Sequence, residues 1–419
     1  MASNVAGSTS ITSNSRSPWT PGNYSRVPYW IYTDEEIFST EMSRIFCGRS
    51  WSYAGLAVEL PEPGSFLSTT IGNRSVIVCR NRDGALRAFA NRCAHRGVKF
   101  CRQRHGKATK FTCPYHQWTY DLNGALKGVP FRGGVKGQGG MPSDFDLTAH
   151  GLQQLRVTEH NGVIFASFCQ DIENFTDYLG ETNRYYFERV FDGRQLQVLG
   201  YTRQLIPGNW KLMFENIKDP YHASLLHVFL VTFGLFRADQ ESQVKMDRTG
   251  RHGLLISRRG SHQATEHTKD IANLRSDFRL RDPRLLDPVK EFKDAATVVM
   301  HTIWPNLIVQ QQSNTIAMRQ IQPRDPGSFE LSWTFFGYAD DDAAMTLRRL
   351  RQANLMSASG LVSGDDSEVM KLAQDGLRSY PECEAILEMG GTATADEEHM
   401  VTETAIRAFY KYYREIMEL

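Results

Sequence analysis

The spacing of the hydrophobic residues changes along the chain and divides it into three parts. In the first part, residues 28–48, the apolar residues fall on one side of a helical wheel, which predicts a helix. Thr33 and Glu36 match a capping box at its start. We expect this helix to pack on the C-terminal part of the chain. Its apolar positions are Ile37, Phe38, Met42, Ile45 and Phe46.

The second part, residues 49–170, consists of short alternating stretches of apolar and polar residues separated by turns. Such alternation predicts β-strands with one buried face. A β-rich domain with several hairpins is therefore expected here. The dipeptides that favour tight hairpin turns are Asp83-Gly84, Asn123-Gly124 and Asn161-Gly162.

The third part, residues 171–419, combines longer helical and strand patterns. Helical spacing is present in DIENFTDYLGETNRYYFERVF, in PGNWKLMFENIKDPYHASLLHVF and in the C-terminal TETAIRAFYKYYREIMEL. The pattern of TVVMHTIWPNLIVQQQSNTIAMRQIQP and FELSWTFFGYA is that of strands. The apolar stripe of the last helix predicts core or subunit packing. Together the patterns predict an α+β fold, in which a β-rich domain precedes an antiparallel sheet covered by helices.

Composition adds few constraints. The 419 residues suffice for two domains, and 48 basic against 47 acidic residues give no argument for nucleic acid or a membrane surface as a partner. No apolar run reaches the length of a membrane-spanning helix, and the N-terminus does not read as a signal peptide. Residues 1–27 are small and polar, and we expect them to be disordered. Seven cysteines without the spacing of a disulfide framework predict reduced thiols in a cytoplasmic protein.

Two short loops of the β-rich part combine a cysteine with a histidine: Cys93 with His95, and Cys113 with His116. In a common zinc finger the two cysteines come first and the two histidines later. The alternating order found here suits a [2Fe–2S] cluster in which both cysteines bind one iron and both histidines bind the other. The pattern C-x-H, seventeen residues, C-x-x-H is that of a Rieske centre. A structural zinc knuckle, or two core cysteines near unrelated histidines, are the alternatives.

A second candidate metal site lies in ENIKDPYHASLLH, which contains Asp219, His222 and His227. On one straight helix a five-residue step would place the two histidines roughly 140° apart, so a bent or irregular turn is needed for both to reach one ion. A histidine pair on such a helix is otherwise a common feature of a core or a surface. Two histidines and one carboxylate, however, form the facial triad of mononuclear Fe(II), which leaves positions for dioxygen and substrate.

With both motifs the chain resembles the large (α) subunit of the Rieske-type aromatic-ring-hydroxylating oxygenases, from about Pro28 to the C-terminus. The resemblance implies a third iron ligand, an aspartate in an acidic pair near the start of a late helix. The stretch GLVSGDDSEVM fits this description, with Asp366 as the ligand. Asp365 and Glu368 are the nearby competitors, and an acidic helix start that complements the helix dipole is the alternative.

The same resemblance implies roles for Asp219 and Asn216. In the family, an aspartate three residues before a histidine ligand accepts a hydrogen bond from that histidine and contacts a cluster-ligating histidine of the adjacent subunit. Carried over, Asp219 would link His222 to His116 of a neighbouring chain. The alternative is a helix cap, because Asp before Pro often starts a helix. Asn216 is expected near the substrate, although only two residues separate it from Asp219, where naphthalene-dioxygenase-like chains have three.

Within the family the chain is most similar to salicylate hydroxylases, anthranilate dioxygenases and terephthalate dioxygenase, through RVPYWIYT, CAHRG, KDPYHASLLH, RRLRQANL and VTETAIR. An aromatic carboxylate needs an apolar slot with a cationic anchor. Arg319, which alternates with apolar neighbours, is the candidate anchor, and a structural ion pair or a subunit contact is its alternative. A terephthalate-type chain has an arginine where this chain has His399-Met400, which favours a monocarboxylate. Candidate cavity walls, which are core residues otherwise, are Phe214, Val228, Phe229, Phe233 and Phe236.

The resemblance thus implies a terminal oxygenase that hydroxylates a salicylate- or anthranilate-type benzoate, with terephthalate-type cis-dihydroxylation as the alternative. The [2Fe–2S] centre would take electrons from a ferredoxin and an NAD(P)H-dependent reductase and pass them to Fe(II), where O2 reacts. A small β subunit is expected in an α3β3 assembly. From the residues alone, a Rieske electron-transfer protein without oxygenase activity and a zinc-binding structural protein remain alternatives.

Overall fold

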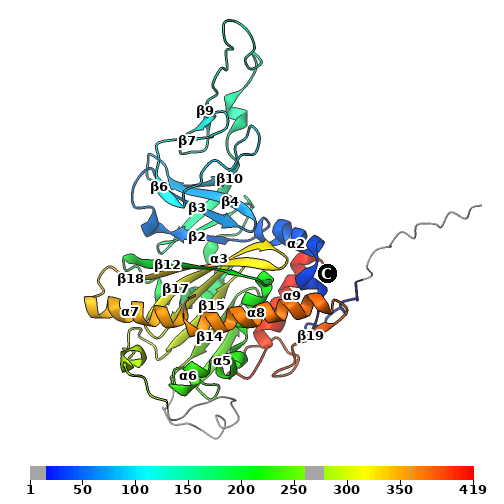
Figure 1. Ribbon diagram of the computed structural model, residues 1–419, viewed down its shortest axis with the longest axis vertical. Helices are drawn as coiled ribbons and strands as arrows, with labels where there is room; N and C mark the ends of the chain where they lie inside the picture. Colours follow the sequence, from blue (N-terminus) through cyan, green and yellow to red (C-terminus); the bar gives the residue numbers. More distant parts are fainter. Residues whose placement is uncertain (1–15, 260–277, 359) are drawn as a thin grey trace, which may run out of the picture.

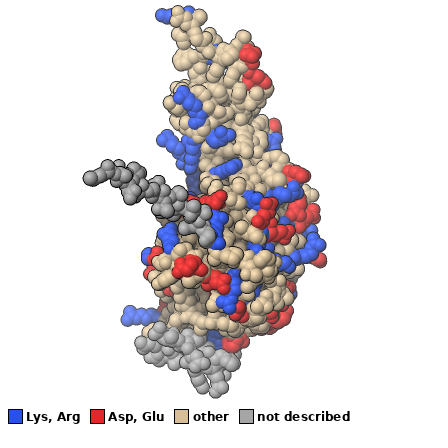
Figure 2. Space-filling model, turned by 90° about the vertical axis from the view of Figure 1, so that its right-hand side faces the viewer, with Lys and Arg blue, Asp and Glu red and all other residues tan. Residues whose placement is uncertain are grey.

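The computed structural model describes residues 16–259, 278–358 and 360–419. A small β-rich part lies above a larger part in which helices surround a sheet (Figure 1). The predicted α+β architecture, a β-rich domain before an antiparallel sheet with helices, is confirmed. Acidic and basic side chains are interspersed over the face seen in Figure 2. No helix in the described ranges is long and apolar enough to cross a membrane.

The β-rich part is built on a seven-stranded antiparallel sheet with the strand order β2-β11-β10-β5-β4-β3-β6. Its strands are β2 (Ser52–Leu56), β3 (Ser65–Ile71), β4 (Arg74–Arg80), β5 (Leu86–Ala90), β6 (His105–Lys107), β10 (Gln154–His160) and β11 (Val163–Ser167). A three-stranded sheet extends from it toward the top of Figure 1. That sheet consists of β7 (Phe111–Thr112), β8 (Thr119–Tyr120) and β9 (Leu126–Gly128).

The three expected hairpin turns connect β4 to β5, β8 to β9 and β10 to β11. Gly84 and Gly124 have φ angles of 81° and 78°, a left-handed conformation that glycine adopts without a steric penalty. Asn161 and Gly162 also have positive φ, as the two-residue turn favoured by Asn-Gly requires.

The larger part contains a second seven-stranded antiparallel sheet, with the order β12-β18-β17-β16-β15-β14-β13. Its strands are β12 (Leu196–Ile206), β13 (Ser242–Met246), β14 (Gly253–Ser257), β15 (Val298–Ile303), β16 (Leu307–Gln312), β17 (Thr315–Asp325) and β18 (Ser328–Tyr338). The helices of this part are α3 (Phe175–Val190), α4 (Trp210–Lys218), α5 (Pro220–Leu226), α6 (Val228–Thr232), α7 (Ala343–Met356), α8 (Leu361–Ser379) and α9 (Thr404–Met417).

The two faces of this sheet have different neighbours. Leu254 and Val299 pack with Tyr186 of α3, whereas Leu255 and Met300 line a cavity beside α5. Because successive side chains of a strand point to opposite faces, α3 and the cavity lie on opposite sides of the sheet. The β-rich part covers the side that carries α3 (Figure 1).

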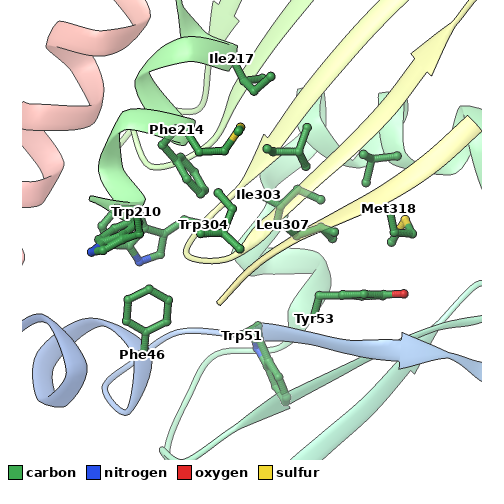
Figure 3. Packing of buried hydrophobic residues seen from close by; sticks show 14 of the residues in the cluster. Phe46, Trp51, Tyr53, Trp210, Phe214, Ile217, Ile303, Trp304, Leu307 and Met318 are labelled. Atoms are coloured by element: carbon green, nitrogen blue, oxygen red, sulfur yellow. The ribbon is translucent and has the colours of Figure 1, made fainter. Parts of the chain in front are cut away.

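A continuous hydrophobic core connects the parts of the molecule (Figure 3). The ring of Trp210 in α4 lies 5.2 Å from the ring of Phe46 and 6.1 Å from that of Trp304, centroid to centroid. Trp51 and Tyr53 bring the first strand of the β-rich part into the same cluster. The two parts therefore share buried apolar surface, the main source of stabilisation in a folded chain.

The expected disorder of residues 1–27 does not hold for residues 16–27, while residues 1–15 lie outside the described ranges. Trp19 is buried, and its ring centroid lies 5.6 Å from that of Tyr410. β1 (Arg26–Pro28) pairs with β19 (Glu384–Ile386). Local composition missed this order because the partners of these residues lie near the other end of the chain.

The segment 28–48 packs on the larger part as expected, but it is not one helix. Asp34, not Thr33, caps the second piece, because its carboxylate accepts two backbone N–H groups of the first turn. Glu41 fixes the segment in place: its carboxylate lies 2.6 Å from the Lys211 Nζ, and both side chains are fully buried. The pieces are α1 (Trp30–Thr33), α2 (Glu35–Glu41) and a π-helical turn, η1 (Met42–Phe46).

Candidate metal centres and cavity

The single helix expected over residues 207–229 is broken at Asp219. Pro220 takes the first position of α5, where its missing N–H is not needed, and the Asp219 carboxylate accepts the backbone N–H of His222 at 3.1 Å. His227 lies between α5 and α6 with non-helical angles, φ −88° and ψ 70°. This break removes the divergence of a straight helix, and both imidazoles turn toward one point.

The carboxylate of Asp366 meets the two imidazoles at that point. Its Oδ1 lies 3.6 Å from His222 Nε2 and 3.2 Å from His227 Nε2. One ligand atom of each residue lies within 4.8 Å of the others, and no other set of three His, Cys, Asp or Glu side chains comes this close in the described ranges. Two imidazoles and one carboxylate are the donor set that a mononuclear non-haem iron uses.

The competitors of Asp366 lie elsewhere. Asp365 Oδ2 is 3.3 Å from His227 Nδ1, the ring nitrogen on the far side from Asp366. Glu368 is exposed. Successive residues of a helix are 100° apart, so only one aspartate of the pair can point into the site. A carboxylate on the second nitrogen of a histidine fixes the orientation of the ring. Asp365 is placed to fix the ring of His227 in this way.

Asp219 acts both as a cap and as a partner of His222. Its backbone carbonyl accepts the Nδ1–H of His222, and its Oδ2 lies 3.5 Å from the same nitrogen. A proton on Nδ1 leaves the lone pair on Nε2, the atom that faces Asp366. Asn216 donates to Asp366 Oδ1 at 2.9 Å, and its own Oδ1 is buried without a hydrogen-bond partner. The residue expected near the substrate thus lies at the converging ligands.

The charged forms of Asp366 and His222 are stabilised although both side chains are largely buried. Burial disfavours the Asp366 carboxylate, but hydrogen bonds from His222 and His227 hold its pKa well below the ordinary value. Burial likewise disfavours a charged His222, but hydrogen bonds to Asp219 and Asp366 raise its pKa to about 10. An environment that favours positive charge next to a buried carboxylate suits a metal cation, which competes with the proton for Nε2.

The first Cys/His loop lies between β5 and β6, and the second connects β7 to β8. Cys93 and Cys113 are buried in one hydrophobic cluster, whereas His95 and His116 are only partly buried and their ring centroids are 4.7 Å apart. The Nδ1 of His95 is buried without a hydrogen-bond partner. Cysteines inside and histidines toward the surface fit a cluster with one sulfur-bound and one nitrogen-bound iron.

Three aromatic and basic side chains surround these loops. The Tyr120 hydroxyl lies 3.2 Å from Cys93 Sγ and accepts a backbone N–H at 3.0 Å, which leaves its proton free to point at the sulfur. The ring of Trp118 stacks on His95 at 4.7 Å. Arg96 Nη2 lies 2.9 Å from the Nε2 of His116. Hydrogen bonds to the sulfurs and the nearby charge are among the factors that set the reduction potential of such a cluster.

A cavity opens beside the three converging residues of the larger part. The Arg319 guanidinium faces it, 3% exposed. Nη1 of Arg319 donates to Gln310 Oε1 at 3.2 Å, Nη2 lies 3.2 Å from Met213 Sδ, and Nε has no partner. Burial lowers its pKa to about 10. The apolar walls are Ile217, Pro220, Ala223, Leu230, Phe236, Leu255, Val298, Met300, Trp333, Met356 and Val362.

The expectation that Phe214 lines the substrate cavity is wrong. Its ring is fully buried and packs between those of Trp210 and Phe409, with centroid distances of 5.9 and 5.8 Å. Figure 3 shows it beside Trp210. Phe214 precedes Asn216 by two residues, so the two side chains point in nearly opposite directions from α4. Of the other candidate walls, Phe236 lines the cavity, whereas the cavity lining does not include Val228, Phe229 or Phe233.

The cavity residues that were not predicted include Gln310, Gln312 and Trp333. The two glutamines follow each other on one face of β16, and Gln310 Nε2 donates to Gln312 Oε1 at 3.3 Å. Trp333 of β18 lies opposite Arg319 in the sheet register, with the guanidinium 4.3 Å from its ring. Polar residues in the otherwise apolar strand LIVQQQ were the feature that could have pointed to this site.

Comparison with known proteins agrees with this geometry. The family model described as "Ring hydroxylating alpha subunit (catalytic domain)" matches residues 179–419, and "Rieske [2Fe-2S] domain" matches residues 50–138. The chain is 50% identical to the large oxygenase component of salicylate 5-hydroxylase from Ralstonia sp, over 95% of this chain and 96% of that protein.

Two further relatives and one solved structure cover nearly the whole chain. Identity is 40% with the large subunit of anthranilate 1,2-dioxygenase from Burkholderia cepacia, over 94% of this chain and 93% of that one. Identity is 41% with subunit alpha 2 of the terminal oxygenase component of terephthalate 1,2-dioxygenase from Comamonas sp, over 95% of this chain and 97% of that one. The crystal structure of naphthalene 1,2-dioxygenase from Rhodococcus sp. has the same fold, with a TM-score of 0.78, 24% identity and 94% of both chains covered.

Proposed function

The chain belongs to the Rieske-type ring-hydroxylating oxygenases, as a large (α) subunit, and on that premise we propose that its substrate is an aromatic monocarboxylate of the salicylate or anthranilate type. It is an enzyme of aromatic compound breakdown that carries a [2Fe–2S] cluster and a mononuclear iron. The three similar relatives act, by their names, on salicylate, anthranilate and terephthalate, all of them aromatic carboxylates.

The observation that carries the proposal is the environment of Arg319. A buried cation without a carboxylate partner is costly, and the described partners of this guanidinium are an amide oxygen, a thioether and an aromatic ring. No described carboxylate lies within ion-pair distance of it, and the charge of Asp366, which lines the same cavity, only partly offsets the effect of burial on Arg319. A substrate carboxylate would supply the missing charge and fix the ring against the apolar walls.

The cavity favours one carboxylate over two. Arg319 is the one Lys or Arg among the described residues that line it. Met400, in the position where a terephthalate-type chain has an arginine, is fully buried in a hydrophobic cluster, and His399 is exposed beside Glu397. A second carboxylate would therefore meet apolar walls without a cation. Cis-dihydroxylation of a terephthalate-type substrate remains the second candidate, on the strength of the 41% identical relative alone.

We assign the metal ligands as follows. Cys93, His95, Cys113 and His116 hold the cluster, and His222, His227 and Asp366 hold the mononuclear iron. When bound, these groups supply electrons and the site at which dioxygen reacts. The protein residues would position the metal ligands and the substrate: Asp219 and Asp365 orient the two imidazoles, and Arg319 holds the substrate carboxylate in the cavity. We place the boundary between the domains between β11 and α3.

Strands β7 and β9, near the Cys113–His116 loop, and helix α5, which contains His222, lie on opposite sides of the larger sheet (Figure 1). Electrons therefore need a route between subunits. We propose that Asp219, which is partly exposed, meets His116 of a neighbouring chain. The corresponding assembly is a trimer of α subunits with a small β subunit, α3β3, which receives electrons from a ferredoxin and an NAD(P)H-dependent reductase in the cytoplasm.

Turnover of salicylate, anthranilate, benzoate and terephthalate with reduced protein and O2, followed by identification of the products, tests the substrate class. We expect Arg319→Ala to raise KM for the preferred carboxylate by about tenfold to hundredfold, the effect of a lost charge-assisted contact. KM for an uncharged amide analogue should change much less. Arg203→Ala, which alters an exposed arginine outside the cavity, is the matched control. Equal loss for both substrates would assign Arg319 to structure and remove the support for a carboxylate.

A further inference from the structure

A second pocket, of about 360 Å³, lies away from both metal centres, where α1, α4, α8 and β19 meet. Three tyrosines line it, together with small and aliphatic residues: Tyr29, Tyr32 and Tyr380. Glu215 is the one charged residue among the described residues of its lining. The pocket is therefore an aromatic enclosure with a single carboxylate.

The carboxylate of Glu215 has no cation of its own. The nearest ammonium, Lys211 Nζ, is bound to Glu41 at 2.6 Å. Glu41 also accepts hydrogen bonds from the Tyr413 hydroxyl at 2.6 Å and from the Trp210 indole at 2.7 Å. The Lys211 ammonium is therefore already paired with a carboxylate that has its own hydrogen bonds. Two carboxylates thus share one ammonium in this region, and the excess negative charge lies on the group that faces the pocket.

Tyrosine hydroxyls keep Glu215 in place without neutralising it. Tyr410 donates to its Oε1 and lies 2.8 Å from the Tyr32 hydroxyl. Burial raises the pKa of Glu215 to about 7, and these hydrogen bonds oppose the shift. Glu215 is therefore ionised only above about pH 7 unless a bound cation stabilises its charged form. The faces of the tyrosine rings attract cations as well.

From this charge count and this lining we propose that the pocket binds a cationic group of the alkylammonium or guanidinium class. The rim favours a basic side chain of a partner subunit as its source. Tyr380 of the lining is 59% exposed, and the exposed Leu372 and Ile386 are chain neighbours of the lining residues Ala373 and Ala385. Exposed apolar residues near a polar anchor are typical of a protein contact surface. A free amine has the same chemistry, and the experiment separates the two sources.

The test compares wild type with Glu215→Gln, which keeps the shape and the hydrogen bonds of the side chain but removes its charge. Asp375→Asn is the matched control, because Asp375 is an exposed acid of α8 outside the lining. Ethylammonium and guanidinium chloride are titrated by calorimetry against sodium chloride at equal ionic strength. In parallel, the oligomeric state and the affinity for the small subunit are measured by light scattering and sedimentation.

We expect Glu215→Gln to weaken cation binding or subunit affinity by about tenfold or more, with Asp375→Asn unchanged. Tyr380→Ala, an exposed position that leaves the core intact, should weaken the same interaction. If the variant loses assembly and no binding of free cations is measurable, the occupant is a basic side chain. If free cations bind to wild type but not to the variant, and assembly is unchanged, the occupant is a small amine. If neither Glu215→Gln nor Tyr380→Ala changes cation binding or assembly, the proposal is wrong.

Discussion

At the scale of single residues, the aspartate pair near the start of α8 shows how two identical side chains acquire different tasks. Asp366 points at the Nε2 atoms of His222 and His227, and Asp365 at the Nδ1 atom of His227. Asp366 is 3% exposed, so its charge depends on the site, whereas the Asp365 side chain is 38% exposed and hydrated. Loss of the two carboxylates should therefore have unequal effects.

We predict that Asp366→Ala abolishes binding of the mononuclear iron, while Asp365→Asn weakens it by roughly tenfold to hundredfold, the usual effect of removing the group that orients a ligand. Iron content by elemental analysis, beside the visible spectrum of the cluster, measures this. The cluster spectrum should be unchanged in both proteins. Normal iron content in Asp366→Ala would transfer the third ligand to Asp365.

Glu215 gives a prediction for the pH dependence of stability. Its folded pKa of about 7 lies above its ordinary value of 4.5, so the folded protein keeps a proton that the unfolded chain releases. Stability therefore falls as pH rises through this window, by at most about 3 kcal/mol for this group. We expect Glu215→Gln to lack this loss. Chemical unfolding of both proteins between pH 4.5 and 7.5 in amine-free buffer measures it, and parallel curves would contradict the assignment.

At the scale of secondary structure, the break between α4 and α5 positions the mononuclear site. An uninterrupted helix would turn His222 and His227 apart, and the pair Asp219-Pro220 ends one helix and starts the next. The same Asp219 caps α5 and contacts the imidazole of His222. Its role in folding and its proposed role in electron transfer overlap, and the choice of substitution can separate them.

Asparagine and aspartate are comparable N-caps, whereas alanine is a poor one. Asp219→Asn should therefore keep the melting temperature, both metals and a reducible cluster, but pass electrons to the iron very slowly. Asp219→Ala should in addition lose about 1 kcal/mol of stability. Single-turnover oxidation of the pre-reduced cluster, with substrate and O2, measures the transfer. A near-normal rate in Asp219→Asn would leave Asp219 as a cap only.

At the scale of the whole molecule, the separation of the two centres predicts complementation between subunits. His116→Ala removes a proposed cluster ligand, and His222→Ala removes a proposed iron ligand, so each protein alone should be inactive. If electrons cross from one subunit to the next, co-expressed chains carrying one change each should form mixed oligomers with partial activity. Differently tagged chains allow purification of the mixture. Inactive mixed oligomers would show that transfer stays within one chain.

The sequence by itself determined the β-hairpins, the helix-covered sheet, the family and the residue types of both metal centres. These features rest on short-range spacing: a turn dipeptide, an alternating strand or a C-x-H loop depends on neighbours a few residues away. The choice of Asp366 from the aspartate pair of α8 came from the family resemblance instead, and the structure brings this residue next to His222 and His227.

Only the tertiary structure decided which side chains surround the cavity and which belong to the core. Phe214 and Phe236 are equally plausible walls in the sequence. The orientation of α4 buries the first in the core, whereas the second packs in the cluster that contains Leu255 and Val298 and lines the cavity with them. Trp19 and Tyr32 acquire their places from Tyr410, nearly four hundred residues away. Such contacts depend on how elements pack over long separations, which no local pattern encodes.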